Sequence, residues 1–227
     1  MTDCANNHID TLRGCPLFAN LPAERLAPLA AATQERHYAA GETLLDKGDH
    51  PVALLLVKQG RLKETCFSPH GEERIIEILG PDRCCGEAAL APDTPMPFSV
   101  IALSDATVLH IDRHPLLEFA ADPEFAMGLI TALSGRILSL IHDVEAFTLQ
   151  PPVQRVAGYL SDLIQPLKES DSLALPAAKK VIASRLGMTP EAFSRALRDL
   201  ADAGLLEVSL RRIAIKQRQR LRDFAAS

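Results

Sequence analysis

The stretch MTPEAFSRALRDLADAGLLE, residues 188–207, combines a helix start with an amphipathic repeat. Thr189 suits the N-cap, because its hydroxyl can accept one of the free backbone N–H groups of the first turn. Pro190 suits the first helical position, and Glu191 lies at the positive end of the helix dipole. Apolar residues recur at steps of three and four, which predicts one buried face and one polar face. The polar face carries Glu191, Ser194, Arg195 and Arg198.

The segments around this helix predict a winged helix-turn-helix over residues 151–227. Helices are expected at residues 153–167 and 176–187, the second ending at Gly187, a typical C-terminal stop. Only Gly187, Met188 and Thr189 then separate the second helix from the helix that follows, which is the spacing of a helix-turn-helix. Residues 204–217 predict two short strands around Ser209 to Arg212, which would form the wing.

Charge supports a nucleic-acid role for this segment alone. Residues 151–227 hold 13 Lys or Arg against 8 Asp or Glu, a net charge of +5, whereas the rest of the chain carries −10. A recognition helix enters the major groove with its N-terminus first, where Arg binds guanine, Glu accepts from cytosine and Ser bonds either edge. The alternative is that these charges are merely solvated. We predict that DNA is bound by Thr189, Glu191, Ser194, Arg195 and Arg198.

A long helix is expected over residues 122–150, directly before this module. Apolar residues follow one another at steps of three and four from Phe125 to Phe147, and the prolines of QPPV end the helix. Such a stripe fits a core helix or the seam of a dimer equally well. The candidate seam residues are Leu129, Leu133, Ile137, Leu140 and Val144.

The sequence pattern of the first 121 residues is typical of a small β-barrel or β-sandwich. Short apolar or alternating runs at residues 41–49, 52–67, 68–80 and 98–112 are separated by glycine-containing turns, and a helix is expected at residues 21–34. The chain is therefore predicted to be of the α+β class, with a β-barrel-like domain at 1–121, a long helix at 122–150 and a DNA-binding domain at 151–227.

Composition excludes several other classes of protein. The run VALLLV, residues 52–57, is much shorter than the roughly 18 residues of a membrane span, and the N-terminus lacks a secretion signal. Five cysteines, an odd number without framework spacing, fit a reducing compartment. No phosphate loop, nucleophile elbow or zinc-ligand spacing occurs, so no enzyme activity is expected. We expect a cytoplasmic protein without a membrane partner.

The chain resembles the transcription regulators named after the cyclic-AMP receptor protein and the fumarate and nitrate reduction regulator (CRP/FNR). The resemblance runs from LFANLPAERLAPLA through GETLLDKGD, VKQGRLKE and CGEAAL to the helix-turn-helix. It implies a cyclic-nucleotide-binding-like β-roll, a homodimer paired through the long helix, and contact with RNA polymerase. The Glu-x-x-Ser-Arg pattern at Glu191, Ser194 and Arg195 is similar to that of regulators that read a TTGAT-N4-ATCAA palindrome.

The resemblance places the effector pocket at Gly86 and Glu87. Members that bind cyclic nucleotides carry an arginine after this pair, but this chain has no Lys or Arg between Arg83 and Arg113. A buried phosphate without a cation is costly, so cyclic AMP is not expected. The cysteines at positions 4, 15, 66, 84 and 85 do not match the spacing of an iron-sulfur cluster. A redox regulator remains an alternative, either through a thiol switch at the adjacent Cys84 and Cys85, which could equally be buried apolar side chains, or through an iron-sulfur cluster. A cyclic-nucleotide-binding protein without DNA function is a further alternative.

The segments APDTP, SPHGEERIIEIL and TPEAFSR resemble the dissimilatory nitrate respiration regulator (Dnr) branch, which is implicated in sensing nitric oxide through haem. That branch carries a histidine before LF, where this chain has Cys15 and Pro16. A Cys-Pro pair is a common setting for a haem thiolate. The candidate axial ligand of a haem is therefore Cys15. The second ligand would come from His8, His37, His70 or His110, among which the sequence gives no ranking, and His8 is taken as the candidate.

Overall fold

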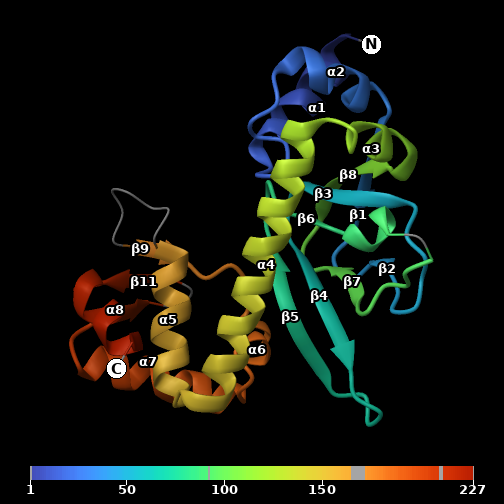
Figure 1. Ribbon diagram of the computed structural model, residues 1–227. Helices are drawn as coiled ribbons and strands as arrows, with labels where there is room; N and C mark the ends of the chain where they lie inside the picture. Colours follow the sequence, from blue (N-terminus) through green and yellow to red (C-terminus); the bar gives the residue numbers. More distant parts are fainter. Residues whose placement is uncertain (1, 92, 165–171, 210–211, 227) are drawn as a thin grey trace. The chain divides into compact units, whose positions relative to one another are not determined.

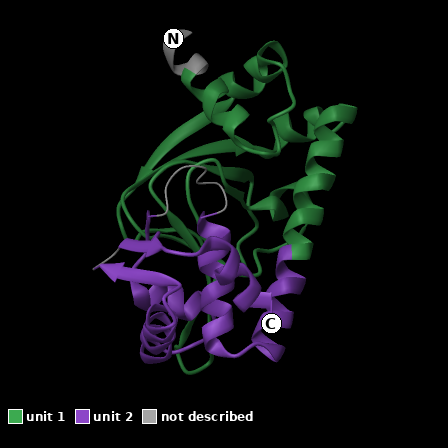
Figure 2. Ribbon diagram, turned by 90° about the vertical axis from the view of Figure 1, so that its left-hand side faces the viewer, with its two compact units in different colours: residues 1–138 green, residues 139–227 purple. Residues whose placement is uncertain are grey.

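The computed structural model describes residues 2–91, 93–164, 172–209 and 212–226. The chain forms two compact units, residues 1–138 and 139–227, which Figure 2 shows in green and purple. The boundary lies inside the long helix α4 (Pro123–Leu149), so each unit includes part of that helix. The predicted domain boundaries at residues 121 and 150 stay predictions.

Unit 1 is a β-roll made of two four-stranded antiparallel sheets (Figure 1). The first sheet has the order β1-β8-β3-β6 and the second the order β2-β7-β4-β5. The strands are β1 (Thr33–Tyr38), β2 (Thr43–Leu45), β3 (Ala53–Gln59), β4 (Leu62–Phe67), β5 (Glu73–Leu79), β6 (Cys84–Cys85), β7 (Ser99–Ala102) and β8 (Ala106–Asp112). A short 3-10 helix, η1 (Glu87–Leu90), follows β6.

Strand β3 is covered on both faces, which explains its unbroken apolar sequence. Because successive side chains of a strand point to opposite faces, Leu54 and Leu56 enter the core beneath the helices, whereas Leu55 and Val57 enter the core between the sheets. The turn from β3 to β4 requires Gly60, which has φ +83° and where a Cβ would lie 2.3 Å from the Asp105 carbonyl oxygen.

Three helices pack on the roll: α1 (Thr2–Gly14), α2 (Ala23–Ala31) and α3 (Arg113–Phe119). Helix α2 is shorter than the predicted 21–34 helix, and that boundary was wrong at its C-terminal end. Thr33 and the residues after it are taken up by β1, which pairs with β8. Tertiary pairing with β8 therefore overrides the local helical pattern at residues 33 and 34.

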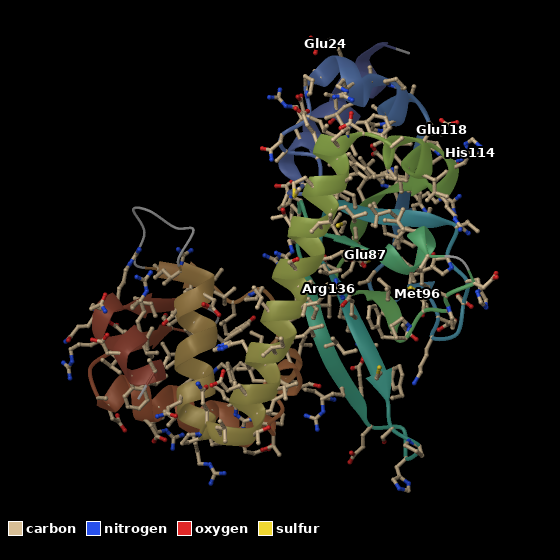
Figure 3. The ribbon with its side chains drawn as sticks, viewed as in Figure 1. Glu24, Glu87, Met96, His114, Glu118 and Arg136 are labelled. Carbon is tan, nitrogen blue, oxygen red and sulfur yellow. The ribbon has the colours of Figure 1, made fainter. Side chains whose placement is uncertain are left out.

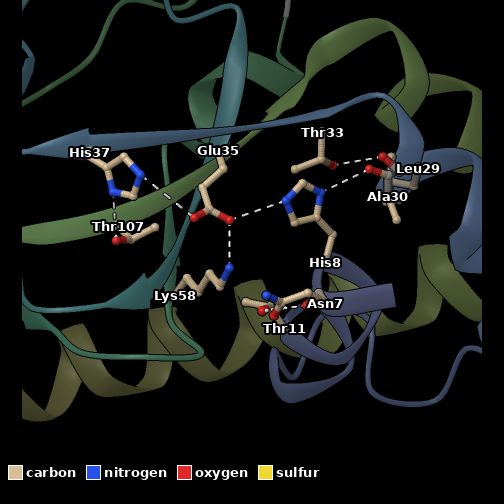
Figure 4. A network of polar contacts seen from close by, with 10 residues as sticks. All are labelled: Asn7, His8, Thr11, Leu29, Ala30, Thr33, Glu35, His37, Lys58 and Thr107. Carbon is tan, nitrogen blue, oxygen red and sulfur yellow. Dashed lines mark hydrogen bonds and ion pairs between the residues drawn. The ribbon is translucent and has the colours of Figure 1, made fainter. Parts of the chain in front are cut away.

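A polar network joins α1 to the first sheet (Figure 4). Glu35 of β1 accepts a hydrogen bond from Lys58 Nζ at 2.6 Å and contacts His8 Nε2 at 3.4 Å. The lysine is the main cause of the lowered pKa of the Glu35 carboxyl. His8 Nδ1 lies 3.2 Å from the Ala30 carbonyl oxygen, so this histidine connects α1, α2 and β1.

Unit 2 contains the C-terminal part of α4 and a winged helix-turn-helix. Its helices are α5 (Pro152–Ile164), α6 (Lys179–Arg185), α7 (Pro190–Asp202) and α8 (Arg218–Ala226). A three-stranded antiparallel sheet has the order β10-β11-β9, with β9 (Ser172–Ala174), β10 (Leu206–Ser209) and β11 (Arg212–Ile215). The two predicted wing strands are confirmed. Residues 210 and 211, which separate them in the sequence, lie outside the described residues, as does the end of the predicted 153–167 helix.

Candidate nucleic-acid interface and effector site

The turn before α7 has the geometry that its sequence predicts. The Thr189 hydroxyl accepts a hydrogen bond from the Ala192 backbone N–H at 3.2 Å, and Pro190 begins the helix. Gly187 has φ +64°, and the next residue, Met188, donates its N–H to the Ala183 carbonyl at 3.0 Å. This arrangement satisfies carbonyls at the end of α6 while reversing the chain toward α7.

Helix α7 separates an apolar face from a polar face. The buried face consists of Phe193, Ala196, Leu197 and Leu200. Glu191, Arg195 and Arg198 are exposed, and Ser194 is half-buried. Hydrogen bonds from its own backbone N–H and from the Thr189 hydroxyl lower the pKa of the Glu191 carboxyl, which keeps it ionised as an acceptor. The structure thus brings the predicted DNA-binding residues together at the N-terminal end and outer face of one helix.

Within unit 2, two arginines fasten the helix-turn-helix to the end of α4. Arg185 of α6 is 9% exposed and donates to Asp143 Oδ2 at 2.7 Å. Arg155 of α5 donates to the Leu186 carbonyl at 3.0 Å and lies over the Phe147 ring at 5.8 Å. The helix-turn-helix of α6 and α7, here called the reading head, is therefore held to α4 by one buried and one half-buried arginine, which the sequence pattern alone did not indicate.

The predicted seam residues of α4 fall into two groups. Leu129 packs against the core of unit 1, as does Phe125, which is fully buried and stacks on Phe18. Gly128 allows this approach, because a Cβ there would lie 2.8 Å from the Leu17 carbonyl oxygen. Leu129 is thus partly buried by contacts within unit 1. The other four, Leu133, Ile137, Leu140 and Val144, are exposed.

Exposed apolar residues continue along α4 in an unbroken heptad pattern. Six side chains at alternating steps of three and four are between 39% and 65% exposed: Ile130, Leu133, Ile137, Leu140, Val144 and Phe147. By length and hydropathy α4 could also cross a membrane, and little of it is buried. However, Arg136 and Asp143 lie in the middle of such a span, and both are ion-paired to other parts of the chain.

The predicted effector pair is engaged by a residue of α4. Gly86 has φ +84° and begins η1, and Glu87 Oε1 accepts a hydrogen bond from Arg136 Nη1 at 3.2 Å (Figure 3). Arg136 Nη2 also donates to Glu64 Oε2 at 2.6 Å. The Glu64 side chain is 0% exposed, and burial raises its pKa to about 7 against the opposing effect of Arg136.

Arg136 and Glu64 were missed by the sequence analysis. The sequence has no Lys or Arg between Arg83 and Arg113, but α4 supplies a guanidinium from a position 49 residues beyond Glu87. Glu64 occupies a position in a strand where alternation alone predicts an apolar side chain. A buried carboxylate needs a cationic partner. The one feature of the sequence that could have indicated this pair is Arg136 itself, a charged residue directly beside the apolar stripe of the long helix.

The two candidate haem ligands are both occupied by protein contacts. Cys15 is 1% exposed and packs in the core beneath the helices. A hydrogen bond with Cys84 lowers the pKa of the Cys15 thiol and raises that of Cys84. Both ring nitrogens of His8 contact oxygen atoms. In this conformation the pair does not fit axial haem ligation, because neither side chain offers a free donor atom.

Comparisons with known proteins agree with this arrangement of modules. Residues 35–122 match the cyclic nucleotide-binding domain, and residues 154–224 match the Crp-like helix-turn-helix domain. The "Probable transcriptional regulator flp" of Lacticaseibacillus casei is 30% identical over 211 residues, covering 92% of this chain and 95% of that protein. The nitrogen fixation regulation protein FixK of Bradyrhizobium diazoefficiens is 24% identical over 231 residues, covering 100% and 94%.

A solved structure shows the same fold. FixK2 from Bradyrhizobium japonicum superposes with a TM-score of 0.78 at 23% identity, covering 86% of this chain and 98% of that chain. One assignment accounts for the β-roll, the long helix and the winged helix-turn-helix, and for the similarity to transcription regulators along the chain. The chain belongs to the CRP/FNR family of DNA-binding transcription regulators.

Proposed function

We propose that the protein is a cytoplasmic, homodimeric regulator that reads a TTGAT-N4-ATCAA-like palindrome and contacts RNA polymerase at its promoters. The observation that carries this proposal is the exposed polar face at the N-terminal end of α7, built from Glu191, Ser194 and Arg195. Arg195 would bind guanine through O6 and N7, and the ionised Glu191 would accept from cytosine N4.

The exposed stripe of α4 supports pairing with a second copy. In heptad positions, the β-branched residues Ile130, Ile137 and Val144 occupy position a, and Leu133, Leu140 and Phe147 occupy position d. This distribution favours two-stranded parallel coiled coils. A parallel dimer has twofold symmetry, so its two α7 helices would meet two inverted half-sites, which is why a palindrome is expected.

Fluorescence anisotropy with a labelled TTGAT-N4-ATCAA duplex tests the proposal. We expect specific binding that weakens steeply with salt, since phosphate contacts release counterions. Arg195→Ala should remove about 1 to 3 kcal/mol of discrimination at the guanine, whereas Arg212→Ala, an exposed wing change, should leave that discrimination intact. Equal affinity of the wild-type protein for the dyad and for a scrambled duplex would refute the target.

Haem-based sensing of nitric oxide, as in the Dnr branch, stays a prediction from the resemblance. A cavity of about 410 Å³ lies beside Pro16 and α4, but the Cys15 thiol faces the core and Cys84. Ligation would require Cys15 and His8 to give up their partners, so no step is assigned to haem. A Soret band that appears on haem addition and disappears in Cys15→Ala is the result that would establish it.

A thiol-based regulator is favoured by one specific contact. Cys84 and Cys85 point into different cores, so they do not face each other, but Cys84 is hydrogen-bonded to Cys15. Hydrogen peroxide would oxidise the Cys15 thiol to a sulfenic acid, transferring one oxygen to the sulfur and leaving as one water. The Cys84 thiol would then displace a second water to form a disulfide.

Peptide mapping after peroxide treatment tests this candidate. A Cys15–Cys84 linked peptide is expected in wild type and in Cys66→Ser, and it should be absent from Cys84→Ser. Dithiothreitol should reverse the link, and the affinity for the dyad should change with it. If peroxide leaves both thiols free while the protein still binds DNA, this mode of regulation is wrong.

A further inference from the structure

Three charged side chains form one cluster inside unit 1. Arg136 of α4 donates to Glu64 of β4 at 2.6 Å and to Glu87 of η1 at 3.2 Å, and its guanidinium lies 5.8 Å from the centre of the Phe98 ring. Figure 3 shows Glu87 and Arg136 next to each other. Placing a fully buried carboxylate in a strand is costly unless a cation meets it. Glu64 therefore makes Arg136 necessary, and Arg136 ties α4 to the roll.

The charge balance of this cluster disfavours an anionic ligand. One guanidinium faces two carboxylates, so the three groups carry a net charge of −1 when both acids are ionised and zero when one is protonated. A phosphate approaching Glu87 would have to displace a carboxylate from Arg136 and would leave that carboxylate buried without a partner. Both consequences oppose binding of a cyclic nucleotide.

The cluster also lies next to the exposed seam of α4. Arg136 precedes Ile137 and occupies heptad position g, which flanks the interface of a two-stranded coiled coil. Asp143, one heptad later, occupies the next g position and pairs with Arg185 of the helix-turn-helix. Each unit thus uses one g position of α4 for an ion pair: Arg136 pairs with the roll within unit 1, and Asp143 pairs with the helix-turn-helix within unit 2.

We propose that Arg136, held by Glu64 and Glu87, is a built-in substitute for an effector that keeps the protein competent to bind DNA without a cyclic nucleotide. The inference rests on the proposed function, because it concerns the regulation of the same dimer. The ion pairs fix the rotation of α4 against the roll. This rotation sets which side chains of α4 face a second copy, and hence whether the two reading heads match one palindrome.

Anisotropy measurements with the full-length protein and the labelled dyad test this inference. Wild type should bind without any nucleotide, and 3′,5′-cyclic AMP or cyclic GMP should change its affinity less than twofold. Arg136→Met should bind at least tenfold more weakly. Arg74→Met, an exposed change on β5 of the same roll, is the matched control and should bind as wild type does.

A second variant separates a loss of coupling from a loss of folding. Arg136→Met alone leaves the buried Glu64 carboxylate without its cation, whereas Glu64→Leu combined with Arg136→Met removes both members of that ion pair, a change that often preserves stability. The double variant should keep a cooperative melting transition and still bind the dyad at least fivefold more weakly. Wild-type affinity in the folded double variant would overturn the inference.

The outcomes distinguish this inference from the proposed function. If wild type binds the dyad only after a cyclic nucleotide is added, Arg136 does not replace the effector, but the proposed function as a regulator that binds this dyad is still supported. If wild type fails to bind the dyad under either condition, the proposed target itself is wrong. Unchanged affinity in folded Arg136→Met overturns the inference alone.

Discussion

His110 shows how a single residue adapts to its surroundings. It alternates between apolar neighbours in β8, and the fold places it in the interior with 8% exposure. The Tyr38 hydroxyl lies 2.7 Å from Nε2, and the two rings stack. Burial is the main reason that the pKa of His110 falls from 6.5 to about 4, with a smaller contribution from Arg36. The residue is thus neutral in the folded protein near pH 7.

This shift predicts acid sensitivity of the folded state. Between pH 6.5 and about 4 the unfolded chain binds a proton at His110 that the folded chain does not, so stability falls as the pH drops through this range. The loss should be on the order of 3 kcal/mol by pH 4. Urea unfolding of wild type and His110→Gln at pH 7 and pH 4.5 measures it.

The variant should lose less stability than wild type between the two pH values. His114→Gln, at an exposed position, is the control and should follow wild type. If the free energy of unfolding falls by the same amount between pH 7 and pH 4.5 in His110→Gln and in wild type, groups other than His110 cause the acid sensitivity.

At the scale of the element, α7 depends on its N-cap. Thr189 satisfies the Ala192 backbone N–H, and without it that donor would lack an intrahelical partner. Thr189→Ala should therefore destabilise the helix by about 1 kcal/mol. For a chain of this size, the melting temperature of the transition that includes α7 should fall by about 2 to 4 °C.

The serine variant provides the comparison for this prediction. Thr189→Ser keeps the capping hydroxyl and should melt within 1 °C of wild type, a small difference on the scale of about 1 kcal/mol expected for losing the cap. If Thr189→Ala and Thr189→Ser melt together, the hydroxyl does not stabilise α7. Differential scanning calorimetry without DNA keeps this effect apart from any DNA contact that Thr189 makes.

At the scale of the whole molecule, the exposed stripe of α4 should decide the oligomeric state. Leu140 lies at position d of the heptad pattern, whereas Leu138 is 67% exposed and lies outside it. Leu140→Glu would place two carboxylates against each other in a buried seam, so dimerisation should weaken at least tenfold. Leu138→Glu adds the same charge off the seam and should leave the dimer intact.

Analytical ultracentrifugation of the two variants and wild type measures this effect. Affinity for the palindrome should fall with the dimer in Leu140→Glu only, because one reading head contacts only one half-site. A monomeric wild type, or equal effects of the two substitutions, would contradict pairing through α4.

The sequence alone determined the order of modules and the helix that carries the polar face. These features depend on local rules: the Thr-Pro start of α7, the Gly187 stop and the three-and-four spacing of apolar residues are all encoded within a few neighbouring positions. The resemblance to the CRP/FNR family likewise depended on contiguous motifs. The candidate DNA-binding residues followed from them because a helix fixes which side chains share a face.

Only the tertiary structure decided which side chains meet across the chain. Residues 33 and 34 became strand because β8 was available to pair with them, and Leu129 is partly buried because the start of α4 packs against the core of unit 1. Glu87 follows Glu64 by 23 residues and Arg136 follows Glu87 by 49, and no helix or strand periodicity relates these positions. These side chains come into contact through long-range packing. A buried charge is costly without a partner of opposite charge, and that partner can come from any part of the chain that the fold brings close.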